Sequence, residues 1–130
     1  MAMKKPKRVS TAIGLLYASS LLGLLEVTTS ATLTGGYSPF ASIDITLYSI
    51  LLVIAFIIGR GINTARVVYI LLAVIWFGSL LFVLPSMFHH KINLMMIFMQ
   101  LVLTIAAVYM LYQQKSNQWF RDQVNKGNLN

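Results

Sequence analysis

Residues 41–84 read ASIDITLYSILLVIAFIIG, then RGINT, then ARVVYILLAVIWFGSLLFVL, so two long apolar runs are joined by a short basic link. Neither run alternates between apolar and polar residues, and each is about twice as long as a strand of a membrane barrel. A helix needs roughly 20 residues to cross a hydrocarbon layer ~30 Å thick. The stretch therefore predicts two antiparallel transmembrane helices, over residues 41–59 and 65–84.

Two further apolar runs of similar length flank this pair, over residues 11–29 and 92–112. The links between the four runs are short, so consecutive helices should be antiparallel neighbours. A chain of 130 residues fits a single domain. The predicted fold is an all-α, integral membrane four-helix bundle with up-down-up-down topology, over residues 1–112.

Residues at the ends of the runs support these limits. Ser38-Pro39 is typical of a helix start, because a proline in the first turn lacks only an N–H that has no partner there. Gly59 and Pro85 are typical of helix ends. We therefore expect the second helix to begin near Phe40 and the third helix to close at Pro85.

The tail over residues 113–130 is polar, and Trp119 and Phe120 are its large apolar residues before Leu129. Aromatic side chains favour the boundary between lipid and water. We interpret the tail as a cytoplasmic segment able to form a short interfacial helix, with Trp119 and Phe120 as its anchor.

The composition excludes several classes of protein. Hydrophobic residues make up 58% of the chain and charged residues 10%, which is too apolar for a water-soluble domain. A formal net charge of +7 would indicate nucleic acid in a soluble protein, but here it indicates orientation in a lipid bilayer, and no nucleic-acid partner is expected. The chain has no cysteine, which excludes a disulfide, a thiolate nucleophile and a cysteine metal site.

Positive charges gather on one side of the predicted bundle. Nine of the ten lysines and arginines lie before the first run, between the second and third, or after the fourth, and Lys91 is the exception. Loops on the cytoplasmic side carry the excess of these residues in membrane proteins. Both termini are therefore predicted to lie in the cytoplasm.

Glu26 is an ionisable residue well inside a predicted span, and such a residue is a functional hypothesis because an unpaired charge there is costly. It follows Thr11 by fifteen residues, which is about 22 Å along a helix and places it past the midplane, toward the outer face. It also lies near the predicted C-terminus of the helix, where the helix dipole disfavours negative charge. We expect Glu26 to be paired, protonated or exposed to water.

Other polar residues are predicted on the same outer side. Together they form a possible ion or proton site made of Glu26, Asp44, His89, His90 and Lys91. The alternative is structural: Glu26 pairs with Lys91, while Asp44 completes the start of the second helix.

Thioethers and imidazoles follow the third run. Met87, His89, His90 and Met95 are ligand types that suit Cu(I), so they are candidates for a metal site. The alternative is that the methionines are adaptable packing residues and the histidines are solvated. No spacing motif favours the metal.

Small and polar residues predict close helix contacts. Gly14 and Ala18, like Ser19 and Gly23, are separated by three residues, a spacing that permits close contact within the chain or between copies. In the fourth run, Gln100 is expected to hydrogen-bond across the bundle and fix its packing.

No catalytic constellation is visible in the sequence. It has no Ser/His/Asp arrangement with supporting context, no glycine-rich phosphate loop beside a strand and no HExxH motif. We therefore expect neither an enzyme nor a bound cofactor.

Two segments resemble a widespread class of small four-span bacterial inner-membrane proteins. They are Asn63-Thr-Ala-Arg66, which precedes the third run, and Ser116-Asn-Gln-Trp119-Phe120, which follows the fourth. A basic N-terminus completes the pattern. The resemblance implies a bacterial inner-membrane location and the four-span topology, and it transfers no activity and no site residue.

Leu25-Glu26-Val27, followed by Thr28-Thr29, is similar to the first helix of the small multidrug-resistance transporters. The resemblance implies that Glu26 would bind protons and cationic substrates. Glu26 lies further outward than the glutamate of that family, and the other helices depart from its pattern.

Three functional hypotheses follow. The first is a membrane protein that acts through a protein partner or by forming a homo-oligomer, as an accessory subunit, a scaffold or an immunity-type protein. The second is a small proton-coupled transporter that uses Glu26 and needs a dimer, because four short helices leave little room for a cavity. The third is a metal-handling protein.

Overall fold

The structure is a computed structural model that describes residues 4–36, 39, 41–87 and 91–129. Within these residues the chain forms five helices and no strand, and four of the helices are long and apolar enough to cross a membrane. The predicted all-α four-helix bundle is confirmed. The chain is a multi-pass membrane protein.

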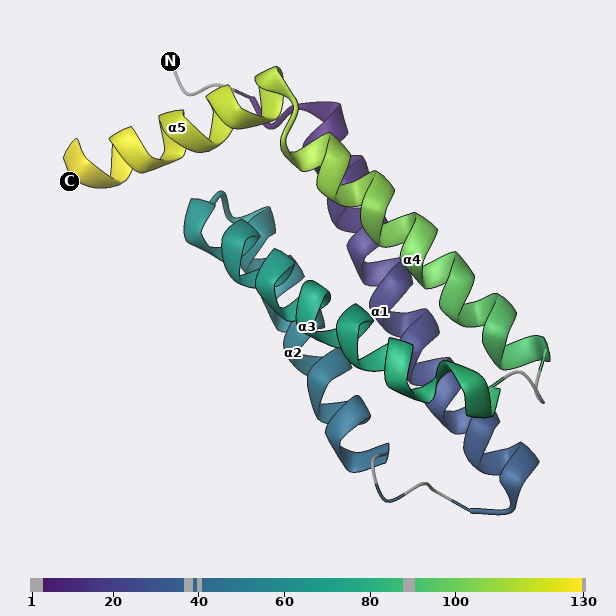
Figure 1. The fold of residues 1–130 in the computed structure, drawn as a ribbon. Coiled ribbons are helices and arrows are strands. Elements are labelled where there is room, and N and C mark those ends of the chain that lie inside the picture. Colours follow the sequence, from purple (N-terminus) through teal and green to yellow (C-terminus); the bar gives the residue numbers. More distant parts are fainter. Residues whose placement is uncertain (1–3, 37–38, 40, 88–90, 130) are drawn as a thin grey trace.

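The helices follow the predicted order along the chain. They are α1 (Lys7–Thr34), α2 (Ala41–Gly59), α3 (Asn63–Met87), α4 (Lys91–Leu111) and α5 (Gln114–Leu129). Figure 1 shows that the start of α1, the link between α2 and α3, and the end of α4 lie at one end of the bundle, which we call the terminal end. The opposite end is called the far end. After α4 the chain turns, and α5 extends sideways from the terminal end.

α1 is longer than the predicted span at both ends. It begins directly after Pro6, whose carbonyl accepts the N–H groups of Val9 and Ser10 at 3.1 and 3.2 Å. It ends at Gly35, which has a φ of 77° and donates its N–H to the carbonyl of Ala31. This left-handed conformation favours glycine, so the helix continues until it reaches one.

α3 continues through Pro85 to Met87. The prediction that Pro85 closes this helix is therefore wrong. Proline removes the N–H that residue 85 would donate to the carbonyl of residue 81, but only two residues follow it, so it disturbs only the last turn.

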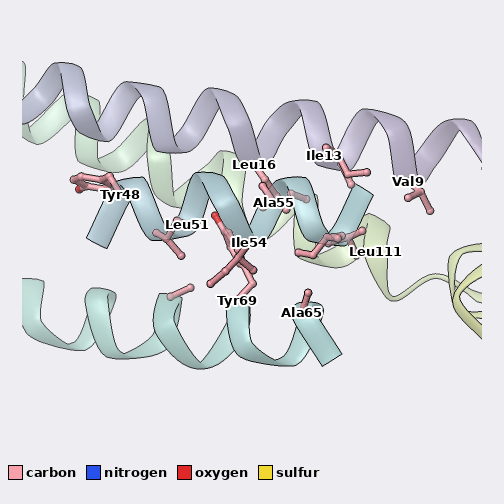
Figure 2. Packing of buried hydrophobic residues seen from close by; sticks show 14 of the residues in the cluster. Val9, Ile13, Leu16, Tyr48, Leu51, Ile54, Ala55, Ala65, Tyr69 and Leu111 are labelled. Carbon is pink, nitrogen blue, oxygen red and sulfur yellow. The ribbon is translucent and has the colours of Figure 1, made fainter. Parts of the chain in front are cut away.

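α1 lies at the centre of the bundle. It packs most extensively against α4 and α2, while α3 packs mainly against α2. Figure 2 shows labelled side chains of the first three helices directed into the space between them, Leu16, Ala55 and Tyr69 among them. Several buried positions are alanines, which allow close approach of helix backbones where lipid provides no hydrophobic drive for association.

The outer surface of the spans is apolar. Phe82 is 89% exposed, and Leu81, Met95 and Tyr109 are each 68–70% exposed. In water such a surface would be unfavourable, but lipid solvates it readily. Several polar side chains are instead buried inside the bundle, among them Ser19, Gln100 and Thr104, and Arg66 is buried at the terminal end.

Candidate functional site

Glu26 is buried, with 6% of its side chain exposed. The apolar span Lys7–Leu33 has its midpoint at residue 20, so Glu26 lies six residues, or about 9 Å, from that midpoint toward the far end. Eight residues of α1 follow it before Gly35. The expectation that Glu26 lies near the end of its helix is therefore wrong, and its carboxyl group lies beyond the short range of the helix dipole.

Two polar neighbours of Glu26, Asp44 and Tyr48, come from α2. The carboxyl groups of Glu26 and Asp44 interact electrostatically with each other, and both interact electrostatically with the hydroxyl group of Tyr48. The ring of Tyr48 lies directly on Gly23, one turn before Glu26, where any side chain would overlap it. Glycine at this position thus lets Tyr48 lie across α1.

The outer cluster predicted from the sequence is only partly assembled among the described residues. Glu26 and Asp44 lie near each other, with Asp44 half-buried in the first turn of α2. Lys91 is the first residue of α4 and is exposed, and it makes no ion pair with Glu26. His89 and His90 lie outside the described residues. The part that the structure describes therefore holds two acidic groups with no cation between them.

A hydrogen-bond network lies deeper in the bundle around Gln100, which is 1% exposed. Ser19 Oγ lies 3.3 Å from the carbonyl oxygen of Gln100, to which it donates, and 2.9 Å from Thr104 Oγ1. Tyr48 donates its hydroxyl to Gln100 Oε1 at 3.2 Å. The network joins α1, α2 and α4, as expected for a polar residue that fixes packing within a membrane.

The remaining space inside this network is very small. A cavity of about 10 Å³ is lined by Ser20, Tyr69 and Gln100, among others. Ser20 Oγ and Gln100 Nε2 are buried there without a hydrogen-bond partner among the described residues. Such a volume holds at most one water molecule, so no substrate fits in this cavity.

The predicted packing residues divide between two faces of α1. Ser19 and Gly23 are buried in the contacts described above. Gly14 and Ala18 are exposed, and a side chain added at Gly14 would meet nothing within 4 Å. This second pair takes no part in the contacts between helices of one chain.

The metal candidates are largely outside the described part of the chain. His89 and His90 are not described, and the side chain of Met87 is not either. Met95 is 68% exposed and lines an apolar groove of about 460 Å³ with Leu80 and Phe98. Among the described residues no three His, Cys, Asp or Glu side chains come together. The metal site stays a prediction.

A second buried charge lies at the terminal end. Arg66, on the first turn of α3, is 6% exposed. Its guanidinium donates to Asn63 Oδ1 through Nε at 2.9 Å and also through Nη2, and to the carbonyl oxygen of Leu111 through Nη1 at 2.7 Å. Nη1 also donates to Asn117 Oδ1 at 2.9 Å. One side chain thus connects α3, α4 and α5.

Aromatic rings complete the surroundings of Arg66. Its guanidinium carbon lies 3.9 Å from the ring centroid of Phe120 and 4.7 Å from that of Tyr112. Ring faces attract a cation, so both contacts favour the charged side chain. Every acceptor around the guanidinium in the described part of the chain is a neutral oxygen, and no carboxylate balances the charge.

A recess of about 480 Å³ opens beside this side chain. Its polar and aromatic lining comes from Asn63, Arg66, Tyr112, Asn117, Arg121 and Asn125. The recess therefore contains two guanidinium groups and three amides, and none of the described residues that line it carries a carboxylate.

Trp119 and Phe120 lie inside the protein, at 4% and 0% exposure. Trp119 packs against Gly61, whose φ of 89° requires glycine, and lies 5.5 Å from Lys5 Nζ. The two aromatic residues therefore attach α5 to the bundle, whereas the sequence predicted that they anchor it in lipid.

Sequence reasoning missed Arg66 as a site residue and counted it only as a charge that sets orientation. The signal was present in the two segments of the four-span resemblance, because Arg66 of the first segment contacts Asn117 and Phe120 of the second. Asn63, also of the first segment, accepts a hydrogen bond from Arg66. Tyr48 and Tyr69 were missed because a tyrosine within an apolar run carries no spacing that marks it.

A scan against family models finds no match, and searches of the curated proteins and of the solved structures find none either. Both resemblances therefore stay predictions.

Proposed function

We propose that this protein resides in the bacterial inner membrane with the terminal end in the cytoplasm. Nine of the ten lysines and arginines lie at that end, including Arg66, while Lys91 begins α4 at the far end. The excess of cations on one side supports this orientation.

We further infer that the protein acts without catalysis, by binding a membrane protein partner or by self-association. The small polar cavity in the core carries this proposal, because a volume of about 10 Å³ cannot hold a substrate. A partner would then contact the lipid-facing exterior. On it, Gly14 and Ala18 form an open face of α1 on which the backbone of another helix can approach closely.

Native mass spectrometry of protein extracted in mild detergent tests this proposal. We expect a complex larger than one chain, made either of several copies or of this chain with a foreign subunit. Gly14→Leu should reduce the complex at least fivefold, because its side chain would block the face. Gly78→Leu is the matched control, since Gly78 also has no neighbour within 4 Å but lies on α3. A monomer with nothing co-purified would contradict the proposal.

A second candidate function is proton-coupled transport through Glu26. Glu26 is buried beside Asp44, and no cation among the described residues pairs with the two acids. This favours the second candidate, because two neighbouring carboxyl groups attract a proton or a cation. Since the polar cavity described above holds at most one water molecule, the pathway would have to form between two copies.

Uptake by proteoliposomes under an imposed proton gradient tests this candidate. Glu26→Gln should abolish uptake of a cationic dye, and Asp122→Asn, which removes an acid outside the spans, should leave it unchanged. Equal uptake by the wild type and Glu26→Gln would eliminate transport through Glu26.

A further inference from the structure

The recess at the terminal end has the charge and the donors of an anion site. Arg66 uses four of its five N–H groups in the contacts described above, which leaves one N–H on Nη2 free. Burying a cation is costly unless an opposite charge or strong hydrogen bonds compensate it. The described hydrogen-bond partners of Arg66 are all neutral, so an anion in the recess would compensate the positive charge of its guanidinium.

Other donors border the same recess. Arg121 is exposed and makes no hydrogen bond among the described residues, so its guanidinium is available. The same holds for the side-chain amide of Asn125. Arginine forks match phosphate oxygens in geometry and bind them with strong, charge-assisted hydrogen bonds.

The position of the recess indicates where the phosphate comes from. Arg66 lies on the first turn of a spanning helix and Tyr112 directly follows another, so the recess lies at the level of lipid headgroups. Val124, which is 44% exposed, adds an apolar wall. A recess at this level, charged on one side and apolar on the other, suits a phospholipid better than a free ion in water.

We propose that the recess beside Arg66 binds the phosphate of an anionic phospholipid. Arg66 is the fixed, buried part of the site and Arg121 the exposed part. The bound headgroup lies between α3 and α5, and it adds a lipid contact to the attachment of α5. This site is independent of the proposed action through a partner.

Lipid titration followed by native mass spectrometry tests the proposal. Protein depleted of lipid in mild detergent is titrated with phosphatidylglycerol and, separately, with phosphatidylcholine. We expect phosphatidylglycerol to bind at least fivefold more tightly. Arg121→Gln should weaken its binding about fivefold, the equivalent of about 1 kcal/mol for one cation near the headgroups.

Lys115→Gln is the matched control, because it removes an exposed cation from the same helix outside the recess. It should weaken binding less than twofold. Equal affinity for the two lipids, or an equal effect of the two variants, would overturn the proposal. An excess of inorganic phosphate should not displace the lipid, and full displacement would overturn the lipid as the source of the phosphate.

Discussion

Two buried ionisable residues in the described part of the bundle, Arg66 and Glu26, are held in different ways. Arg66 donates to three residues on three helices and lies against two aromatic rings. Glu26 has a similar exposure, but among the described residues the charged group that interacts with it is another acid, Asp44. A buried ionisable side chain with many hydrogen-bond partners stabilises the contacts between helices. One that lies beside a group of the same charge contributes little to stability, which favours a functional role for it. The substitutions below test this difference.

Arg66→Ala should have the largest effect on stability. It removes four hydrogen bonds and two cation–π contacts, and we expect a loss of about 3 kcal/mol in the free energy of unfolding. Unfolding by denaturant in mixed micelles measures it. Arg60→Ala is the control, because Arg60 is exposed, and its loss should be about 0.5 kcal/mol or less. Similar losses for the two variants would show that the contacts of Arg66 do not stabilise the packing of α3, α4 and α5.

Gly23→Ala should cost about 2 kcal/mol, because the added methyl group overlaps the ring of Tyr48 and the helices must separate. Gly14→Ala on the same helix meets no neighbour. Since alanine favours helices over glycine, that variant should be neutral or up to about 1 kcal/mol more stable. The same micelle unfolding assay compares them. Equal behaviour of the two glycines would contradict the close contact of α1 and α2.

Tyr48→Phe should cost about 0.6 kcal/mol, the average for a hydrogen bond between helices in a membrane. It removes the hydroxyl that donates to Gln100 Oε1 and keeps the ring. Tyr109→Phe is the matched control, because Tyr109 is 70% exposed and lies outside the network. If both variants unfold at the same denaturant concentration as the wild type, the network adds no stability.

Glu26→Gln should have the smallest effect, about 0.5 kcal/mol or less in either direction. The variant keeps the shape of the side chain, and among the described residues the Glu26 carboxyl group makes no hydrogen bond or ion pair that the substitution would remove. Unfolding in mixed micelles again provides the comparison. A loss as large as that of Arg66→Ala would mean that Glu26 is held by a partner, and the contrast between the two ends would be lost.

Much of the fold could be predicted from the sequence, because run length and hydropathy alone determine which segments cross a bilayer. Helix limits were less certain. α1 extends to Gly35 because a left-handed residue, rather than the first polar group, ends it. α3 includes Pro85 because a proline disturbs little so close to a helix end.

The candidate sites were harder to predict. Spanning helices are apolar on all sides, so no stripe shows which face lies inside, and the position of α1 between α2 and α4 cannot be read from the pattern. Gln100 was found because it is polar within an apolar run. Arg66 was not found, because in the sequence an arginine near the end of a span cannot be distinguished from a cation that only sets orientation. Its contacts with Asn117 and Phe120 exist only in the folded chain.

The central claim is that the terminal end and the far end of the bundle lie on opposite sides of one membrane. The chain has no cysteine, so single cysteines can be placed freely. A membrane-impermeant thiol reagent applied to intact cells should label Gly36→Cys and leave Gln118→Cys unlabelled until the cells are opened. Labelling of both positions, or of neither, in intact cells would contradict the account.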